Sequence, residues 1–274
     1  MKSFNSGLLA LLLLTMSLSG CITETESSDN LILATTTSMR DSGLIDSLLP
    51  AFTNQTGIEV DVIAVGTGAA LNLGRAGDAD ILIVHAPQKE IEFIEDGHAE
   101  SRNTFAWNRF VILSPGEVES LEILEFFNEV REQEMCFISR GDNSGTHIKE
   151  QDVWRASSVE YNFSLIETNE GVRPEGDWYY SIGQGMGAAI TMADQKNCVT
   201  LSDKGTAVSR SDIELRINEF ESELTMNPYS AIPLFGDNSN QALELSLFLS
   251  GNTSREIIQK FTINDQFLFN YGAP

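Results

Sequence analysis

The feature that most constrains the fold of this chain is an alternation of short apolar segments with longer amphipathic ones. Residues 31–34, 58–65 and 80–84 have the pattern of buried strands, and each is followed by apolar residues at helical spacing. In the first helical segment these apolar residues are Leu44, Ile45, Leu48, Leu49 and Phe52. Such alternation predicts an α/β fold with a mostly parallel sheet and helices on both of its faces.

Two residues interrupt the first helical segment. Proline is tolerated in the first turn of a helix, where its missing N–H has no bond to lose. We therefore expect Pro50 to restart the helix. Gly57 then ends it, as glycine commonly does at helix C-termini.

The same alternation continues around a break at residues 114–116 (Ser-Pro-Gly). Further strands are predicted at 105–113, 135–139 and 198–201, and further helices through Leu121, Leu124 and Phe127, from Thr146, and from Gly183 to Lys196. Residues 156–182 are polar with scattered glycines and aromatics, which indicates a surface excursion. Asp203-Lys204-Gly205 is predicted to be a turn.

These segments divide the chain into two lobes. Residues 31–112 together with 206–274 form lobe 1, and residues 113–205 form lobe 2. The tail has strand-like segments at 215–220 and 232–235 and helix-like segments at 241–249 and 255–261. We expect this tail to return to lobe 1, which would make that lobe discontinuous in sequence.

The first 30 residues have the layout of an export signal followed by a tether. An apolar run at 8–18 leads into Leu18-Ser19-Gly20-Cys21, which is typical of a lipoprotein signal. The signal is assigned to residues 1–21, with Cys21 lipidated, and residues 22–30 are a flexible tether. An ordinary cleaved signal with an incidental cysteine is the alternative. Either places the mature chain outside the cytoplasm, and the first anchors it to the membrane's outer face.

The charge balance excludes one class of partner. The chain has 40 acidic and 17 basic residues, for a formal net charge of −23. Nucleic acid is therefore not an expected partner, because neutralising its phosphates requires Lys and Arg. The same overall field repels any anionic ligand, so an anion site would need local dipoles aimed at the ligand.

Two cysteines remain in the mature domain, Cys136 and Cys198, both in strand-like segments. A disulfide between neighbouring strands is one reading, since the compartment permits it. Two separately buried thiols are the other. No Cys/His pattern has the spacing of a metal site, and we expect neither a resident metal nor a cofactor.

Four predicted strand-to-helix turns are rich in Gly, Thr and Ser: residues 35–38, 66–68, 140–146 and 183–187. Ligands of open α/β sheets bind at the carboxyl ends of the strands. Helix N-termini there present unpaired N–H groups and a partial positive charge, which suits anions. Ser and Thr are also ordinary helix caps, so one such turn alone indicates little. Four of them in two lobes predict a cleft that encloses a small anion.

Arg140 is the one charged donor that directly follows a predicted strand within these turns. Its guanidinium suits oxyanions, although a salt bridge to Asp142 is the simpler reading. Tungstate, molybdate and sulfate only accept hydrogen bonds near neutral pH, whereas phosphate also donates one. A site built from donors therefore favours the first group. Entry of Asp41, Asp78 or Asp142 into the site would favour phosphate.

Several of these motifs, in this order, resemble the tungstate-binding proteins of the Tup transporter family. They are 33–38 (LATTTS), 62–70 (VIAVGTGAA), 77–87 (GDADILIVHAP), 139–147 (SRGDNSGTH), 176–179 (GDWY), 183–187 (GQGMG) and 227–229 (NPY). The resemblance covers nearly the whole mature chain. It implies a type II periplasmic-binding-protein fold with two lobes and a two-strand hinge.

The resemblance also implies a function and a set of ligand-binding residues. A protein of this kind captures tungstate or molybdate in an interlobe cleft and delivers it to the permease and ATPase subunits of an ABC importer. We expect a monomer that is not an enzyme. The implied anion-binding residues are Thr35, Thr36, Thr37, Thr67, Gly68, Arg140, Ser144, Gly145, Thr146, Gly185 and Met186.

Three other functions stay open from the sequence. A phosphate- or sulfate-binding protein would use the same turns, and so would an anion sensor. A serine-type hydrolase is more remote. Residues 141–145 (GDNSG) have a superficial likeness to a nucleophile loop, with His147 close by, but Ser144 lacks the G-x-S-x-G elbow.

Overall fold

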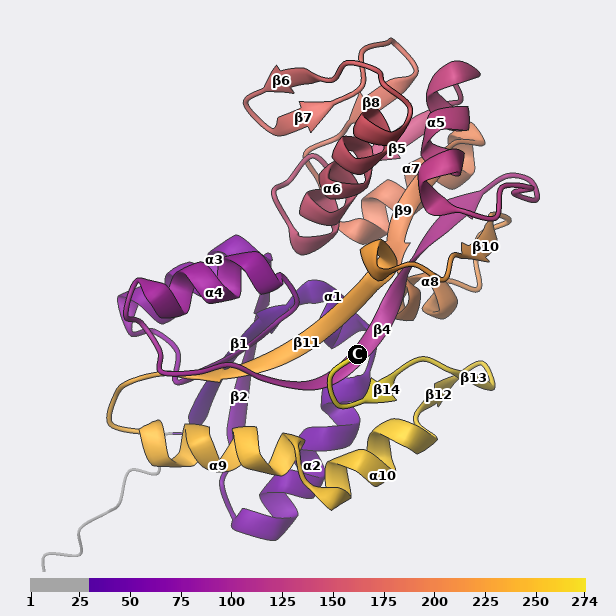
Figure 1. Ribbon diagram of the computed structural model, residues 1–274. Coiled ribbons are helices and arrows are strands. Elements are labelled where there is room, and N and C mark those ends of the chain that lie inside the picture. The colour runs from indigo at the N-terminus through magenta and orange to yellow at the C-terminus, as the bar shows by residue number, and fades with distance from the viewer. Residues whose placement is uncertain (1–29) are drawn as a thin grey trace, which may run out of the picture.

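The computed structural model describes residues 30–274, so the assigned signal, Cys21 and most of the tether lie outside the described residues. The chain forms two α/β lobes, seen below and above in Figure 1. Long strands β4 (Asn103–Ser114) and β11 (Met226–Pro233) run diagonally between them. Among the described residues, no helix combines the length and the apolar character needed to span a membrane.

Lobe 1 is built as the alternating pattern predicts. Its strands β1 (Leu31–Thr36), β2 (Val60–Val65) and β3 (Ile81–Val84) are parallel and adjacent, and β11 pairs antiparallel with β3. Its helices are α1 (Thr37–Asp41), α2 (Leu44–Thr56), α3 (Thr67–Ala76), α4 (Pro87–Glu95), α9 (Ser239–Leu249) and α10 (Asn252–Lys260). Strands β12 (Thr262–Ile263), β13 (Gln266–Phe267) and β14 (Asn270–Tyr271) complete it.

Lobe 2 repeats the arrangement. Strand β5 (Phe137–Ser139) lies between β8 (Tyr179–Ser181) and β9 (Val199–Asp203), parallel to both. Its helices are α5 (Ile123–Glu132), α6 (Gly145–Glu160), α7 (Met186–Lys196) and α8 (Lys204–Ser209), and a small hairpin is formed by β6 (Ile166–Thr168) and β7 (Gly171–Arg173).

The long strand β4 belongs to both lobes. Its first half pairs with β11 and β14 in lobe 1, and Phe110 to Leu113 pair with β9 in lobe 2. Strand β10 (Arg216–Glu219) also pairs with this second half, and Phe220 lies in a lobe 2 core. The predicted lobe boundaries remain a proposal. From this pairing we place the return to lobe 1 between Phe220 and β11, later than residue 206.

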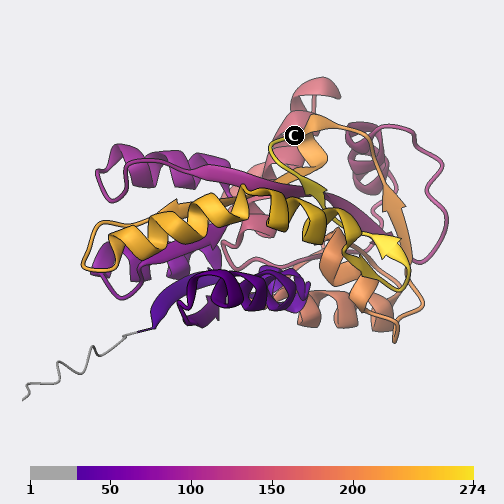
Figure 2. The ribbon, with the colours of Figure 1, turned by 90° about the horizontal axis from the view of Figure 1, so that it is seen from below.

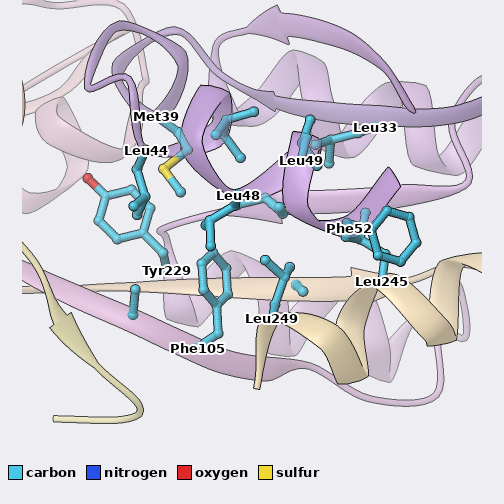
Figure 3. Close-up of a cluster of buried hydrophobic side chains, with 14 of the residues drawn as sticks. Leu33, Met39, Leu44, Leu48, Leu49, Phe52, Phe105, Tyr229, Leu245 and Leu249 are labelled. Carbon is cyan, nitrogen blue, oxygen red and sulfur yellow. The ribbon is translucent and has the colours of Figure 1, made fainter. Parts of the chain in front are cut away.

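Each lobe has an apolar core on both faces of its sheet. In lobe 1, α2, α9 and α10 pack on one face, with Leu33, Phe52 and Leu245 among the buried residues (Figure 3). Figure 2 shows α2, α9 and α10 together on that side. Helices α3 and α4 cover the other face. Burial on both faces explains why β3 and the first four residues of β1 are apolar. Helices α9 and α10 and strand β11, all from the tail, pack or pair with the elements of lobe 1.

Three details of the sequence interpretation were wrong. Pro50 lies inside α2 rather than at a new start. It sits on the exposed face, where solvent can hydrate the carbonyl that loses its N–H partner. Asp203-Lys204-Gly205 is the start of helix α8, which Asp203 caps. Leu121 precedes α5 and is exposed, while Ile123, Phe126 and Phe127 supply the buried face.

The largest error concerns residues 156–182, which are not only a surface excursion. Helix α6 continues to Glu160, and β8 joins the sheet beside β5. Trp178 and Tyr179 are buried there against Trp154. Three-residue strands have too short a pattern to stand out in a polar segment, and this one is held by pairing with a distant strand.

Cys136 and Cys198 form a disulfide, with 4.7 Å between their Cα atoms. They directly precede β5 and β9, and the Val199 N–H donates to the Cys136 carbonyl at 2.8 Å. The bridge therefore ties the starts of two neighbouring strands of lobe 2. Of the two readings left open by the sequence, this structure has the bonded one.

Candidate functional site

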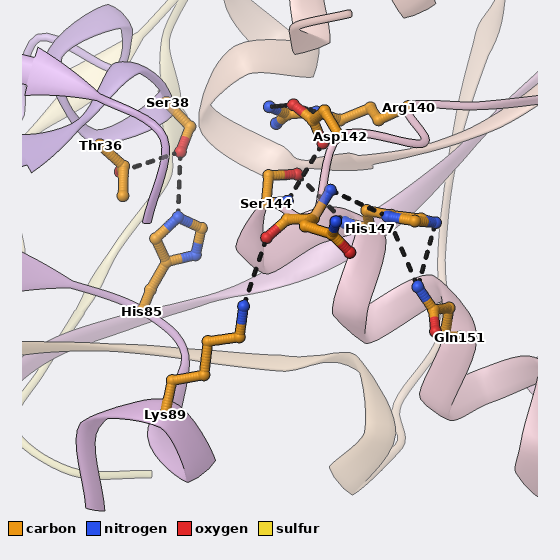
Figure 4. Close-up of polar contacts among 10 residues, drawn as sticks. Thr36, Ser38, His85, Lys89, Arg140, Asp142, Ser144, His147 and Gln151 are labelled. Atoms are coloured by element: carbon orange, nitrogen blue, oxygen red, sulfur yellow. Dashed lines mark hydrogen bonds and ion pairs between the residues drawn. The ribbon is translucent and has the colours of Figure 1, made fainter. Parts of the chain in front are cut away.

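The candidate site lies where the carboxyl ends of β1, β2 and β3 meet those of β5, β8 and β9. We define the interlobe site by Ser38, Thr67 and His85 of lobe 1 and by Arg140, Gly145 and Thr146 of lobe 2. Figure 4 shows side chains from both lobes converging there. Of the four predicted turns, three therefore supply residues to one place, and the fourth lies beside it.

Gly145, the first residue of α6, brings the two lobes into contact. A Cβ added there would lie 3.3 Å from His85 Cε1 and 3.4 Å from Thr67 Oγ1. Lys89 Nζ makes a second contact between the lobes, donating to the Asn143 carbonyl at 3.5 Å. Any side chain at position 145 would push against lobe 1, so glycine permits this approach.

Two buried hydroxyls in the interlobe site have no hydrogen-bond partner. Thr67 begins α3 and is 1% exposed, and Thr146 lies in the first turn of α6 and is 2% exposed. Neither Oγ1 atom is bonded to another described residue. Buried polar atoms are nearly always paired, so an orphan is informative. A hydroxyl can donate to an oxyanion, and these two lie at helix N-termini from opposite lobes.

The threonines at the end of β1 mainly form hydrogen bonds within the protein. The Thr35 hydroxyl donates to the Ile83 carbonyl at 2.8 Å, within the sheet. Thr36 caps α1, because its Oγ1 accepts from the Met39 N–H at 3.2 Å. Thr37 is half-buried at the start of α1. The donor that this turn presents beside His85 is Ser38, which was not among the predicted residues.

His85 is the main residue that the sequence interpretation missed. It follows β3, is buried, and stacks on Tyr229 at 4.9 Å between ring centroids. Its Nδ1 lies 2.7 Å from Asn227 Oδ1 on β11, and its Nε2 lies 3.1 Å from Ser38 Oγ. Burial lowers the pKa of His85 to about 4, an effect that the hydrogen bond to Asn227 opposes and the charge of Arg140 reinforces. His85 is therefore neutral near pH 7.

Arg140 lies in the interlobe site and pairs with Asp142. Its residue is 5% exposed, and its Nη2 and Nε lie 2.5 and 3.2 Å from Asp142 Oδ2. The other carboxylate oxygen of Asp142 accepts from the Ser144 N–H at 3.1 Å. Both oxygens are thus engaged, which leaves Asp142 holding the guanidinium rather than presenting a free acceptor. Arg140 Nη1 has no hydrogen bond to another described residue.

Asp41, Asp78 and Asp203 do not add a free acceptor either. Asp41 pairs with Arg40 in an exposed ion pair, and Asp78 is exposed. Asp203 is buried at the end of β9, near enough for Arg140 to favour its charged form, although burial raises its pKa overall. Its two oxygens accept from the Thr206 N–H and hydroxyl at 2.9 and 2.7 Å.

Ser144 and His147 have structural roles in this arrangement. Ser144 caps α6, and its Oγ accepts from the backbone N–H of His147 at 3.3 Å. The His147 ring turns away, toward the Asn143 N–H at 3.1 Å and Gln151 Nε2 at 3.1 Å. The hydroxyl and the imidazole are therefore not arranged as nucleophile and base.

The fourth turn lies beside Arg140. The Gln184 N–H donates to the Arg140 carbonyl at 3.1 Å, and helix α7 begins two residues later. Its cap, Gly185, is exposed and provides no side-chain bond, while Met186 is buried. Gly68 is half-buried in the first turn of α3. These positions offer backbone N–H groups, the donors that helix N-termini leave unpaired.

Comparison with known proteins identifies the family of this chain. A family model for a PBP superfamily domain matches residues 23–246. The tungstate-binding protein TupA of Peptoclostridium acidaminophilum is 40% identical over 212 residues, which cover 71% of this chain and 69% of that protein.

Two solved structures are also similar. One is that of the tungstate ABC transporter from Geobacter sulfurreducens, with a TM-score of 0.74, 36% identity, and coverage of 85% of this chain and 99% of that chain. The other is the tungstate-binding protein TupA from Desulfovibrio alaskensis G20, with a TM-score of 0.74, 33% identity, and coverage of 89% and 99%.

Two lobes joined by crossing strands, with helix N-termini of both meeting between them, define the class of two-lobed binding proteins of the PBP superfamily. Within that superfamily, the chain belongs to the family of the TupA proteins.

Proposed function

We propose that this chain captures tungstate between its lobes and delivers it to an ABC importer. The observation that carries the proposal is the pair of buried, unpartnered hydroxyls of Thr67 and Thr146, one from each lobe. A tetrahedral oxyanion between them would accept from both, from the N-termini of α3 and α6, and from Arg140. The names of the related proteins support the same ligand.

Selection among oxyanions follows from the hydrogen-bonding character of the site. Its side chains offer donors, and the oxygens of Asp142 and Asp203, two carboxylates that interact with Arg140, are engaged. A fully deprotonated dianion satisfies such donors. A phosphate that retains a proton needs an acceptor, and a donor left facing a donor is costly. This character separates tungstate, molybdate and sulfate from phosphate. Sulfate differs from the other two in size, because its S–O bonds are shorter than W–O and Mo–O bonds. We therefore propose tungstate as the ligand, then molybdate, ahead of phosphate and sulfate.

A thermal-shift titration with the four oxyanions tests this proposal. Ligand at a hundred times its dissociation constant adds about 2.7 kcal/mol to the free energy of unfolding. We expect a clear rise in melting temperature with tungstate, a smaller one with molybdate, and almost none with sulfate or phosphate at equal concentration. A phosphate shift larger than the tungstate shift would overturn the donor-only argument.

Anchoring and transport are also proposed. We infer that Cys21 is lipidated and tethers the domain at the outer face of the cytoplasmic membrane, beside the importer. The membrane fraction of cells expressing the full chain should contain it, and Cys21→Ser should move it to the soluble extracytoplasmic fraction. An unchanged distribution of the Cys21→Ser variant would exclude the lipid anchor.

A further inference from the structure

A chain of hydrogen bonds leads from the interlobe site to the hinge through His85 (Figure 4). Thr36 Oγ1 lies 3.1 Å from Ser38 Oγ, which lies 3.1 Å from His85 Nε2. His85 Nδ1 lies 2.7 Å from Asn227 Oδ1. The Asn227 amide in turn donates to Asn108 Oδ1 on β4 and to the Tyr229 hydroxyl, both at 2.8 Å. The chain thus joins α1 to both long strands that link the lobes.

The direction of each bond in this chain follows from counting protons. Asn227 Oδ1 can only accept, so His85 Nδ1 carries the proton. A neutral imidazole then accepts at Nε2, which takes the single Ser38 proton. The Ser38 oxygen accepts from Thr36 in turn. With His85 neutral, the hydroxyl protons of Thr36 and Ser38 therefore both point along the chain, and neither is offered to an anion.

We propose that oxyanion binding in the interlobe site draws one proton onto His85, which reverses this chain and frees the Ser38 hydroxyl to donate to the anion. The proton comes from solvent and is bound at Nε2, which then donates to Ser38 Oγ. No covalent bond between heavy atoms changes. His85 acts as a positioning residue that sets the direction of the donors. The inference rests on the proposed function of the site.

The surroundings of His85 couple it to charge in the interlobe site. The ring is buried and faces Gly145 across the lobe contact, with Cε1 at 3.3 Å from an added Cβ. Tyr229 and Phe110 stack on it, so solvent does not screen it there. Arg140 is the cation that acts on it in the free protein. A dianion beside Arg140 would compensate that charge and favour the imidazolium.

Other ionisable groups near His85 are engaged elsewhere. Asp142 and Asp203 have their oxygens bonded in lobe 2. On α4, Glu90 accepts from the Ala86 N–H and pairs with Arg102, while Lys89 reaches the Asn143 carbonyl. The Tyr229 pKa lies well above its ordinary value because the group is buried, so it stays protonated. None of these groups takes the place of Ser38 as a partner of His85 Nε2.

The affinity for tungstate should depend on pH through His85. In the free protein the pKa of His85 is about 4, so the residue is neutral near pH 7. If the bound anion raises that pKa, the complex holds more protons than its separate parts. Affinity then increases as the pH falls from the pKa of His85 in the complex toward about 4, its pKa in the free protein, by at most about tenfold per pH unit for one proton.

Titration calorimetry of the whole mature domain with sodium tungstate measures this uptake. The same titration is run near neutral pH in two buffers that differ in ionisation enthalpy. The difference in apparent binding enthalpy gives the number of protons bound per anion. We expect an uptake of up to one proton, and an affinity that falls as the pH rises toward the pKa of His85 in the complex.

The chain has three histidines, which provide matched variants. His85→Gln can still bond to Ser38 and Asn227 but cannot take up a proton near pH 7. It should bind tungstate with no proton uptake and with a nearly flat pH profile. His98→Gln, remote from the interlobe site, should behave as wild type. His147→Gln removes the histidine in the first turn of α6 and should retain the uptake.

Each outcome has a distinct meaning. Failure of wild type to bind tungstate at any pH overturns the proposed function. Binding with no difference between the two buffers overturns this inference alone, and that result needs no variant to fold. Proton uptake that persists in His85→Gln also overturns it. The proton would then be bound by another group, such as His147 or buried Glu150, whose pKa is raised to about 7 chiefly by burial.

Discussion

Arg140→Ala is expected to weaken tungstate binding by about 2–5 kcal/mol, a loss of at least tens of fold in affinity. Two effects add. The variant loses a charge-assisted donor to the anion, and it leaves Asp142, now without its partner at 2.5 Å, as an uncompensated carboxylate beside the dianion. Calorimetric titration of the variant measures the loss directly. Molybdate should be affected as strongly, because both anions carry the same charge.

Two further variants separate these effects. In Arg140→Ala with Asp142→Asn the repulsion is removed, so part of the affinity should return. Arg216→Ala, in an exposed pair with Glu117 far from the site, should leave affinity unchanged. Equal affinity of wild type and Arg140→Ala would remove Arg140 from the site. A double variant that binds no better than the single one would show that Asp142 does not repel the anion.

Loss of the disulfide is expected to lower the free energy of unfolding by about 4 kcal/mol. Cys136 and Cys198 are 62 residues apart in sequence. In the chain-entropy model, a crosslink closing a loop of this size restricts the unfolded chain by about that amount. Urea unfolding of wild type and of Cys136→Ala/Cys198→Ala measures the difference. Tungstate affinity of the folded protein should change little, because the bridge lies at the starts of β5 and β9, away from their carboxyl ends.

Reductant provides the control for this second prediction. It should destabilise wild type toward the level of the double variant and leave the double variant itself unaffected. Identical unfolding curves for oxidised wild type and the double variant would show that the bridge contributes nothing to stability. A fall in tungstate affinity equal to the fall in stability would instead indicate that the bridge shapes the interlobe site.

Much of the fold could be predicted because strands such as β1 and β3 are buried on both faces of the sheet. Leu33 and Ile83 lie in apolar segments that a helix follows, and that pattern is local. Strand β8 could not be found in the same way. Its burial depends on Tyr179 packing beside Phe137, 42 positions earlier by number, and nothing around residue 179 signals a strand.

The same distinction holds for the site. Arg140, Thr67 and Thr146 stand in turns whose composition indicates anion binding. His85 follows a strand with no Gly, Thr or Ser around it to indicate a site. Its role depends on a hydrogen bond to Asn227, 142 residues away, and on its contact with Gly145 in the other lobe. Thr35 shows the opposite case. It lies in a turn whose composition and position indicate anion binding, but its hydroxyl donates to the Ile83 carbonyl within the sheet.

The net charge of −23 remains compatible with an anionic ligand because the site is local. Helix N-termini, hydroxyls and one guanidinium act over a few ångströms, where the ligand is shielded from the surface. Surface carboxylates act from farther away and are screened by salt, with a Debye length of about 8 Å at physiological ionic strength. Affinity for tungstate should therefore depend on the interlobe residues more than on the acidic surface.

The central claim is that one anion is held between the two lobes by Thr67 and Thr146. A crystal structure of the tungstate complex tests it most directly, since tungsten gives a strong anomalous signal. We expect one anomalous peak between α3 and α6, with oxyanion oxygens about 2.5–3 Å from both threonine hydroxyls. A peak elsewhere on the molecule, with both hydroxyls still unpartnered, would contradict it.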